Sequence, residues 1–167
     1  MEKKIKVGKY TFNYVSTMQE LDDNRSYLRH FINSRASING RKGLYLVRAE
    51  KGLKFSGPVL QKDKSNPYYT DTKTLQAKLY SSKTNRNNIV YIGRTISGRG
   101  LEHRVLEFVK FKDRKDQSNH QGGRITWQLK DTKRLHLYVC CVDDEQECLT
   151  AERQLIEKVC PPANVIR

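Results

Sequence analysis

The chain has 167 residues, with 37% hydrophobic and 30% charged residues, and its 32 Lys and Arg outnumber 18 Asp and Glu for a net charge of +14. This length and composition suit one folded domain rather than a disordered chain, and the charge attracts polyanions, nucleic acid before anionic membrane. No run reaches the apolar length of a membrane span and the lysine-rich start lacks a signal peptide's apolar stretch, so we expect a cytoplasmic protein without membrane anchoring.

Residues 1–42 are predicted to form an N-terminal helical arm. Thr17 and Glu20 have the spacing of a capping box. The apolar residues that follow recur at helical intervals and predict a helix that ends near Asn33. A polar segment then closes on a turn signal at Asn39-Gly40.

Two short β-type runs follow, Gly43–Arg48 and Asn88–Gly93, and residues 51–87 form a basic insertion between them. Lysines interleaved with tyrosines in this insertion are typical of a surface that follows a phosphate backbone, although an ordinary solvated insertion has the same composition. The candidate DNA contacts are Lys54, Lys62, Lys64, Lys73 and, beyond the second run, Arg99.

The remaining elements complete a small α+β domain over residues 43–167. With three strands in all, we expect a mainly antiparallel sheet flanked by helices, not a doubly wound parallel sheet. The later elements are predicted as a helix over Leu101–Phe111, a short helix near Arg124, a strand over Leu135–Val142 and a helix over Cys148–Val159.

One acidic residue lies on the apolar side of the last predicted helix. At about 100° per residue, Glu152 falls among Cys148, Leu155 and Val159. Burial of a carboxylate is costly unless a partner compensates the charge. An arginine, a divalent cation or protonation of the carboxyl would each remove this cost, and the spacing by itself leaves all three open.

Taken together, these residues resemble the GIY-YIG nuclease superfamily over about Gly43 to Asn164. Gly43-Leu44-Tyr45 is similar to the first signature triplet, and Tyr91-Ile92-Gly93 matches the second. The family then has a basic residue, an arginine on the next helix, a glutamate within an Ala-Glu-x-x-Leu-Ile pattern, and a later asparagine. The residues matching the family's site are Tyr45, Tyr91, Arg94, Arg104, Glu152 and Asn164.

The resemblance implies a DNA endonuclease that hydrolyses phosphodiester bonds with one divalent metal, Mg²⁺ or alternatively Mn²⁺, held by Glu152. It implies that Tyr45 takes a proton from the attacking water and that Tyr91 positions the water or the phosphate. Arg104 would bind the scissile phosphate, and Asn164 would orient neighbouring groups.

Three departures from the family pattern bear on these roles. The insertion over residues 51–87 separates the two triplets further than usual, and the longer gap after Tyr91 makes Arg99 a competitor of Arg104 for the helix arginine. Arg94 stands where the family usually has a lysine, which keeps the positive charge but does not readily exchange a proton.

The short chain favours sequence-specific restriction of double-stranded DNA. A palindromic site would be matched by a homodimer, because the symmetry of the protein mirrors that of the site. The alternatives are a nuclease for single-stranded or branched DNA and a non-catalytic nucleic-acid-binding module.

Overall fold

The structure is a computed structural model that describes residues 2–55, 72–79, 85, 87–110 and 121–164. The candidate DNA contacts Lys62 and Lys64 lie outside these residues. None of the helices in the described part of the chain combines the length and the apolar character needed to cross a bilayer.

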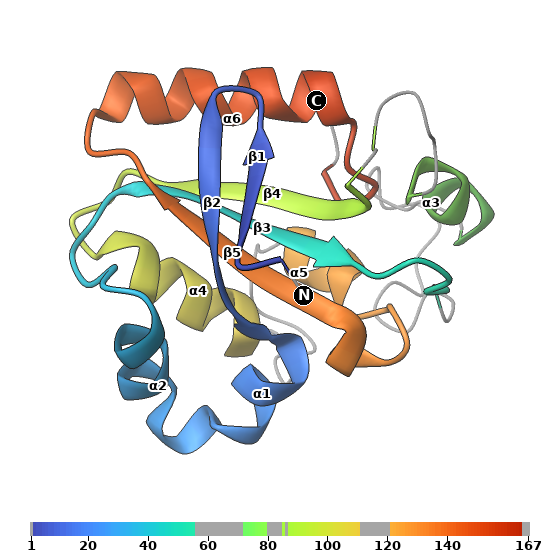
Figure 1. Cartoon of the computed structure of the whole chain (residues 1–167), viewed down its shortest axis with the longest axis horizontal. Coiled ribbons are helices and arrows are strands. Elements are labelled where there is room, and N and C mark those ends of the chain that lie inside the picture. Colours follow the sequence, from blue (N-terminus) through green and yellow to red (C-terminus); the bar gives the residue numbers. More distant parts are fainter. Residues whose placement is uncertain (1, 56–71, 80–84, 86, 111–120, 165–167) are drawn as a thin grey trace.

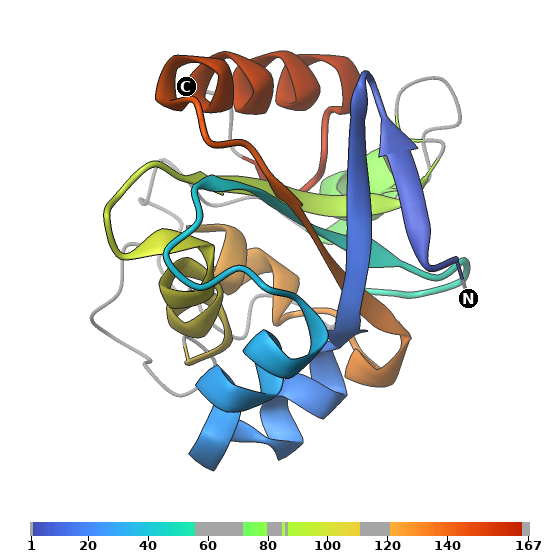
Figure 2. The same ribbon diagram turned by 60° about the vertical axis from the view of Figure 1, so that its left-hand side comes forward.

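A fully antiparallel sheet lies at the centre of the described residues, with helices on both faces (Figure 1). Its five strands, in spatial order, are β1 (Lys4–Val7), β2 (Tyr10–Thr17), β5 (Leu135–Cys141), β3 (Gly43–Ala49) and β4 (Ile89–Thr95). Helix α6 (Glu145–Val159) covers one face, and α1 (Met18–Asp23), α2 (Leu28–Arg35) and α4 (Gly100–Lys110) cover the other (Figure 2). The remaining helices are α3 (Thr72–Leu79), α5 (Gln121–Thr126) and the 3₁₀ turns η1 (Arg25–Tyr27) and η3 (Thr132–Arg134).

The α+β class is confirmed, but the prediction of three strands is wrong, because the described part of the sheet has five. The two missed strands come from the segment predicted to be a helical arm. The capping box in that segment is confirmed, since Thr17 Oγ1 accepts from Glu20 N at 3.1 Å and Glu20 Oε2 accepts from Thr17 N at 2.9 Å. The predicted single helix is divided into α1, η1 and α2.

The hairpin of β1 and β2 is stabilised by its neighbours. Ile5, Val7 and Phe12 are buried in the core cluster that includes α6, whereas Lys4 and Lys6 alternate with them on the exposed side. A two-stranded hairpin is marginal in water by itself. Pairing of β2 with β5 supplies the missing partner, so the lysine-rich start becomes an edge of the sheet rather than an arm.

The two tyrosine triplets lie on adjacent antiparallel strands. Tyr45 of β3 is directly opposite Gly93 of β4. Side chains alternate along β3, so that Leu44 and Leu46 join the core beneath α6, whereas Tyr45 and Val47 join the core beneath α4. Because β4 is the edge strand, side chains from both layers can meet around it.

Candidate active site

An aromatic cluster forms the side of the site that faces α4. Tyr45 is fully buried and Tyr91 is 9% exposed, with their ring centroids 5.7 Å apart. Phe108 of α4 stacks on Tyr91 at 5.8 Å and meets Tyr45 edge-on at 5.8 Å. Trp127 Nε1 donates to the Phe108 carbonyl at 3.0 Å, which ties the segment after α5 to α4. Phe108 was not among the residues that the sequence singled out for the site.

The glycine of the second triplet makes room for the tyrosine of the first. A Cβ atom at Gly93 would lie 2.5 Å from Tyr45 Cζ and 2.6 Å from its hydroxyl oxygen. The Tyr45 ring therefore crosses β4 at the position that lacks a side chain. Phe108 and Tyr91 pack against this ring, so it has little freedom to move aside.

Tyr45 and Tyr91 differ in how deeply they are buried. Burial raises the pKa of Tyr45 well above 10 and also raises the pKa of Tyr91. Tyr45 has no exposed surface, whereas Tyr91 keeps a small exposed fraction. Tyr91 is therefore the member of the pair that solvent or a ligand can reach.

Arg104 is the cation of α4 that acts on both tyrosines. Its positive charge lowers the pKa of Tyr45 and of Tyr91, against the larger effect of burial. Its Nη1 donates to Glu107 Oε2 at 2.8 Å, and the same carboxylate lies 3.2 Å from His103 Nε2. Arg99 is exposed, and its Nη1 lies 3.4 Å from His103 Nε2. The charge of Arg104 thus reaches both tyrosines, whereas Arg99 lies against His103.

Glu152 has an arginine partner. Arg94 Nε lies 2.6 Å from Glu152 Oε2, where the two side chains are 33% and 21% exposed. Arg94 comes from β4 and Glu152 from α6, so this ion pair joins the edge strand to the helix above it. Burial raises the pKa of Glu152 and outweighs the opposing effect of Arg94, whereas the weaker attraction of Arg104 also reaches the carboxyl. Glu152 therefore lies within the electrostatic field of both arginines.

Asn164 is engaged by the backbone of the edge strand. Its Oδ1 accepts from Ile92 N at 2.8 Å, and its Nδ2 donates to Ile92 O at 2.7 Å. Ala163 N also donates to Val90 O at 2.9 Å. The amide therefore satisfies backbone groups that an edge strand otherwise leaves open, and its role is to anchor the segment after α6.

The donor set at Glu152 suits a hard cation that keeps most of its water. The described residues contain no cluster of three or more His, Cys, Asp or Glu side chains able to enclose a metal ion. A site of the zinc type is therefore not formed by them. One partly exposed carboxylate is adequate for Mg²⁺ or Mn²⁺ if water and phosphate oxygens complete the coordination.

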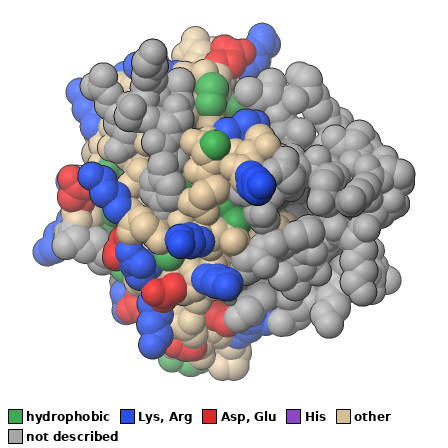
Figure 3. Space-filling view, turned by 90° about the vertical axis from the view of Figure 1, so that its right-hand side faces the viewer, with side chains coloured by type: hydrophobic (Ala, Val, Ile, Leu, Met, Phe, Trp, Pro, Cys, Tyr) green, Lys and Arg blue, Asp and Glu red, His purple; other side chains and the backbone are tan. Residues whose placement is uncertain are grey.

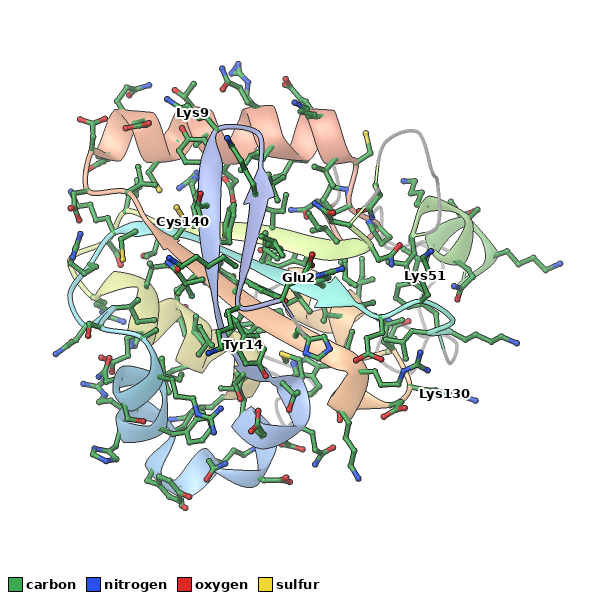
Figure 4. The ribbon with its side chains drawn as sticks, in the orientation of Figure 1. Glu2, Lys9, Tyr14, Lys51, Lys130 and Cys140 are labelled. Carbon is green, nitrogen blue, oxygen red and sulfur yellow. The ribbon has the colours of Figure 1, made fainter. Side chains whose placement is uncertain are left out.

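A separate group of lysines lies where the chain segment after β3 meets α3 and the turn before β5. Lys130 N donates to Lys54 O at 3.2 Å, and Phe55 pairs with Leu129, so two segments far apart in sequence run side by side. A hollow beside them is lined by Lys54 and by Lys73 of α3. In Figure 4, Lys51 and Lys130 project at the same end of the molecule, and in Figure 3 Lys and Arg side chains gather across that face. We call this exposed set the lysine surface: Lys51, Lys54, Lys73 and Lys130.

The structure brings the residues singled out for catalysis together around β4. Two of the residues singled out for DNA contact, Lys54 and Lys73, lie together at the separate lysine surface. Lys130 was missed, because only the fold places it beside Lys54. No family model matches the sequence, and searches of curated proteins and of solved structures returned no match.

Proposed function

We propose that the chain is a DNA endonuclease of the GIY-YIG type that hydrolyses phosphodiester bonds with one divalent cation at Glu152. The observation that carries the proposal is the convergence of Tyr45, Tyr91, Arg104 and the Arg94–Glu152 pair around one edge strand. These groups come from four different elements, β3, β4, α4 and α6.

The residues supply what hydrolysis of a phosphodiester needs. Two arginines can bind and neutralise an anionic phosphate, and Arg104 is the one held beside the tyrosine hydroxyls. Glu152 would hold Mg²⁺ or Mn²⁺, which supplies positive charge to the phosphate oxygens. Asn164 and Phe108 hold the strand and the tyrosine rings in place.

We assign proton acceptance to Tyr91, not to Tyr45. Tyr45 is fully buried, and burial raises its pKa well above 10. Tyr91 retains some exposure and receives help for its phenolate from Tyr45 and from the positive charge of Arg104. Tyr45 then stabilises the negative oxygen of Tyr91 by donating a hydrogen bond. This reverses the roles that the resemblance implies for the two tyrosines.

The cleavage rate is expected to rise with pH across the neutral and mildly alkaline range. Burial holds the pKa of Tyr91 above 10, so the phenolate fraction grows by about tenfold per pH unit below that value. Single-turnover rates measured against pH test this, and Tyr91→Phe should remove the dependence together with most of the activity. A flat profile for the wild-type protein would contradict the assignment.

The lysine surface is proposed to contact the phosphate backbone of double-stranded DNA. Changing Lys54 and Lys130 to Gln should weaken binding and reduce the slope of log affinity against log salt by about two, because each phosphate contact contributes about 0.9. Lys4→Gln with Lys6→Gln is the matched control, since it removes the same charge from β1, the edge strand on the far side of the sheet from β4. Fluorescence anisotropy with a labelled duplex measures both slopes, and equal slopes for the two double variants argue against the surface.

Digestion of plasmid DNA with and without Mg²⁺ tests the proposed function. Discrete fragments that appear only with the cation are expected, since we propose sequence-specific restriction, and a homodimer should then be detected by analytical ultracentrifugation. Single-stranded and branched substrates are digested in parallel. Faster cleavage of either substrate than of duplex DNA would indicate a single-strand or structure-specific nuclease instead of a restriction enzyme. If no substrate is cleaved, the proposed enzymatic activity is wrong and a non-catalytic nucleic-acid-binding module is the remaining proposal.

A further inference from the structure

Arg94 and Glu152 form an ion pair at the position where the proposed cation would bind. The Nε–Oε2 distance is 2.6 Å, and both side chains are mostly shielded from solvent. Among the described residues, the buried Nε of Arg94 has no hydrogen-bond partner of good geometry. Attraction between opposite charges therefore contributes to holding the guanidinium against the carboxylate.

A guanidinium and a divalent cation compete for this carboxylate. Two positive groups a few ångströms apart repel each other strongly where solvent screening is weak. Arg94 exerts the strongest electrostatic attraction on the Glu152 carboxylate, and Arg104 a weaker one. Arg104 donates its hydrogen bond to Glu107 instead. The described residues thus place one guanidinium in direct contact with the carboxylate that the cation needs.

We propose that Arg94 occupies the Glu152 carboxylate in the free protein and transfers to a phosphate of bound nucleic acid, so that cation and nucleic acid bind cooperatively. The inference rests on the proposed function, because it takes Glu152 as the cation ligand. A phosphate offers the guanidinium two acceptor oxygens in the geometry of a bidentate pair, which compensates the loss of Glu152. The free protein then binds the cation weakly, and cleavage chemistry is assembled only on nucleic acid.

The first arm of the test measures Mn²⁺ binding to the protein without nucleic acid by isothermal titration calorimetry. Arg94→Gln should bind Mn²⁺ at least about tenfold more tightly than wild type, which corresponds to about 1.4 kcal/mol. Arg94→Lys keeps the charge and should remain weak, as should Glu152→Gln, which lacks the ligand. Arg48→Gln is the matched control, since it breaks a strand arginine's ion pair with Glu2 away from the site. Circular dichroism melting curves identify any variant that fails to fold, and Arg94→Met then replaces Arg94→Gln.

The second arm uses a short duplex with phosphorothioate linkages, which keep the negative charge and resist hydrolysis. Mn²⁺ should raise the affinity of wild-type protein for this duplex by at least about fivefold. The duplex should raise the affinity of the protein for Mn²⁺ by the same factor, because linkage is reciprocal. In Arg94→Gln, the factor by which Mn²⁺ and the duplex raise each other's affinity should fall towards one. Equal Mn²⁺ affinities of free wild type and Arg94→Gln, in a protein that still cleaves DNA, would overturn the exchange and leave the proposed function standing. If neither wild type nor Arg94→Gln binds Mn²⁺, with or without the duplex, then both the exchange and the proposed function are overturned.

Discussion

Glu152→Gln is expected to lower the rate of DNA cleavage in Mg²⁺ by at least about a thousandfold. The amide has nearly the shape of the carboxylate but carries no charge for a divalent cation. Loss of cation stabilisation worth about 4 kcal/mol in the transition state corresponds to this factor. Single-turnover digestion of plasmid DNA measures the rate, and anisotropy with a labelled duplex shows whether DNA binding is retained.

Glu157→Gln is the matched control for this change. Glu157 lies on the same helix, is 62% exposed and pairs only loosely with Arg153 at 3.6 Å. Its replacement removes the same charge from α6 without touching β4, so cleavage should stay within about twofold of wild type. If Glu152→Gln cleaves as fast as Glu157→Gln, then Glu152 serves only as the ion-pair partner of Arg94, and the cation site is wrong.

Gly93→Ala is expected to reduce both stability and cleavage. Its methyl group would lie 2.5 Å from Tyr45 Cζ, so the ring or the strand must shift within a packed core. Overpacking of this kind typically lowers the free energy of unfolding by about 1–3 kcal/mol. Displacement of Tyr45 also disturbs its hydrogen bond with Tyr91, so cleavage should fall by at least about a hundredfold if positioning within an ångström matters.

Gly98→Ala separates a local effect from a general cost of replacing glycine. A Cβ atom at Gly98 meets nothing within 4 Å, so its replacement should change stability by less than about 0.5 kcal/mol. Urea denaturation gives the free energies, and plasmid digestion gives the rates. A Gly93→Ala protein with wild-type stability and activity would show that the Tyr45 ring does not depend on this glycine.

The elements that the sequence predicted well are those with strong local signals. The apolar runs around Tyr45 and Tyr91 became β3 and β4, and the capping box at Thr17 formed with both of its hydrogen bonds. Glu152 was recognised as anomalous because the helical spacing by itself places its charge on an apolar face, whatever its partner is. In each case, neighbouring residues in the chain carried the information.

The elements that the sequence did not predict depend on partners distant in the chain. The hairpin of β1 and β2 forms because β5 and α6 cover it, and the alternation in Lys4-Ile5-Lys6-Val7 is too short to predict a strand by itself. Helix α3 lies within the segment that was predicted only as a basic insertion. Likewise, Lys130 joined Lys54 only through backbone pairing of the two segments.

By itself, the sequence determined the class of the fold, the two tyrosine strands and the residues of the candidate site, since periodicity and motif spacing are local properties. Only the tertiary structure decided how those residues are paired. It placed Arg94 on Glu152, Arg104 on Glu107 and the Tyr45 ring over Gly93. Which charges neutralise each other, and which hydroxyl is buried more deeply, follow from the packing of β4 between α4 and α6, which joins residues that are far apart in the chain.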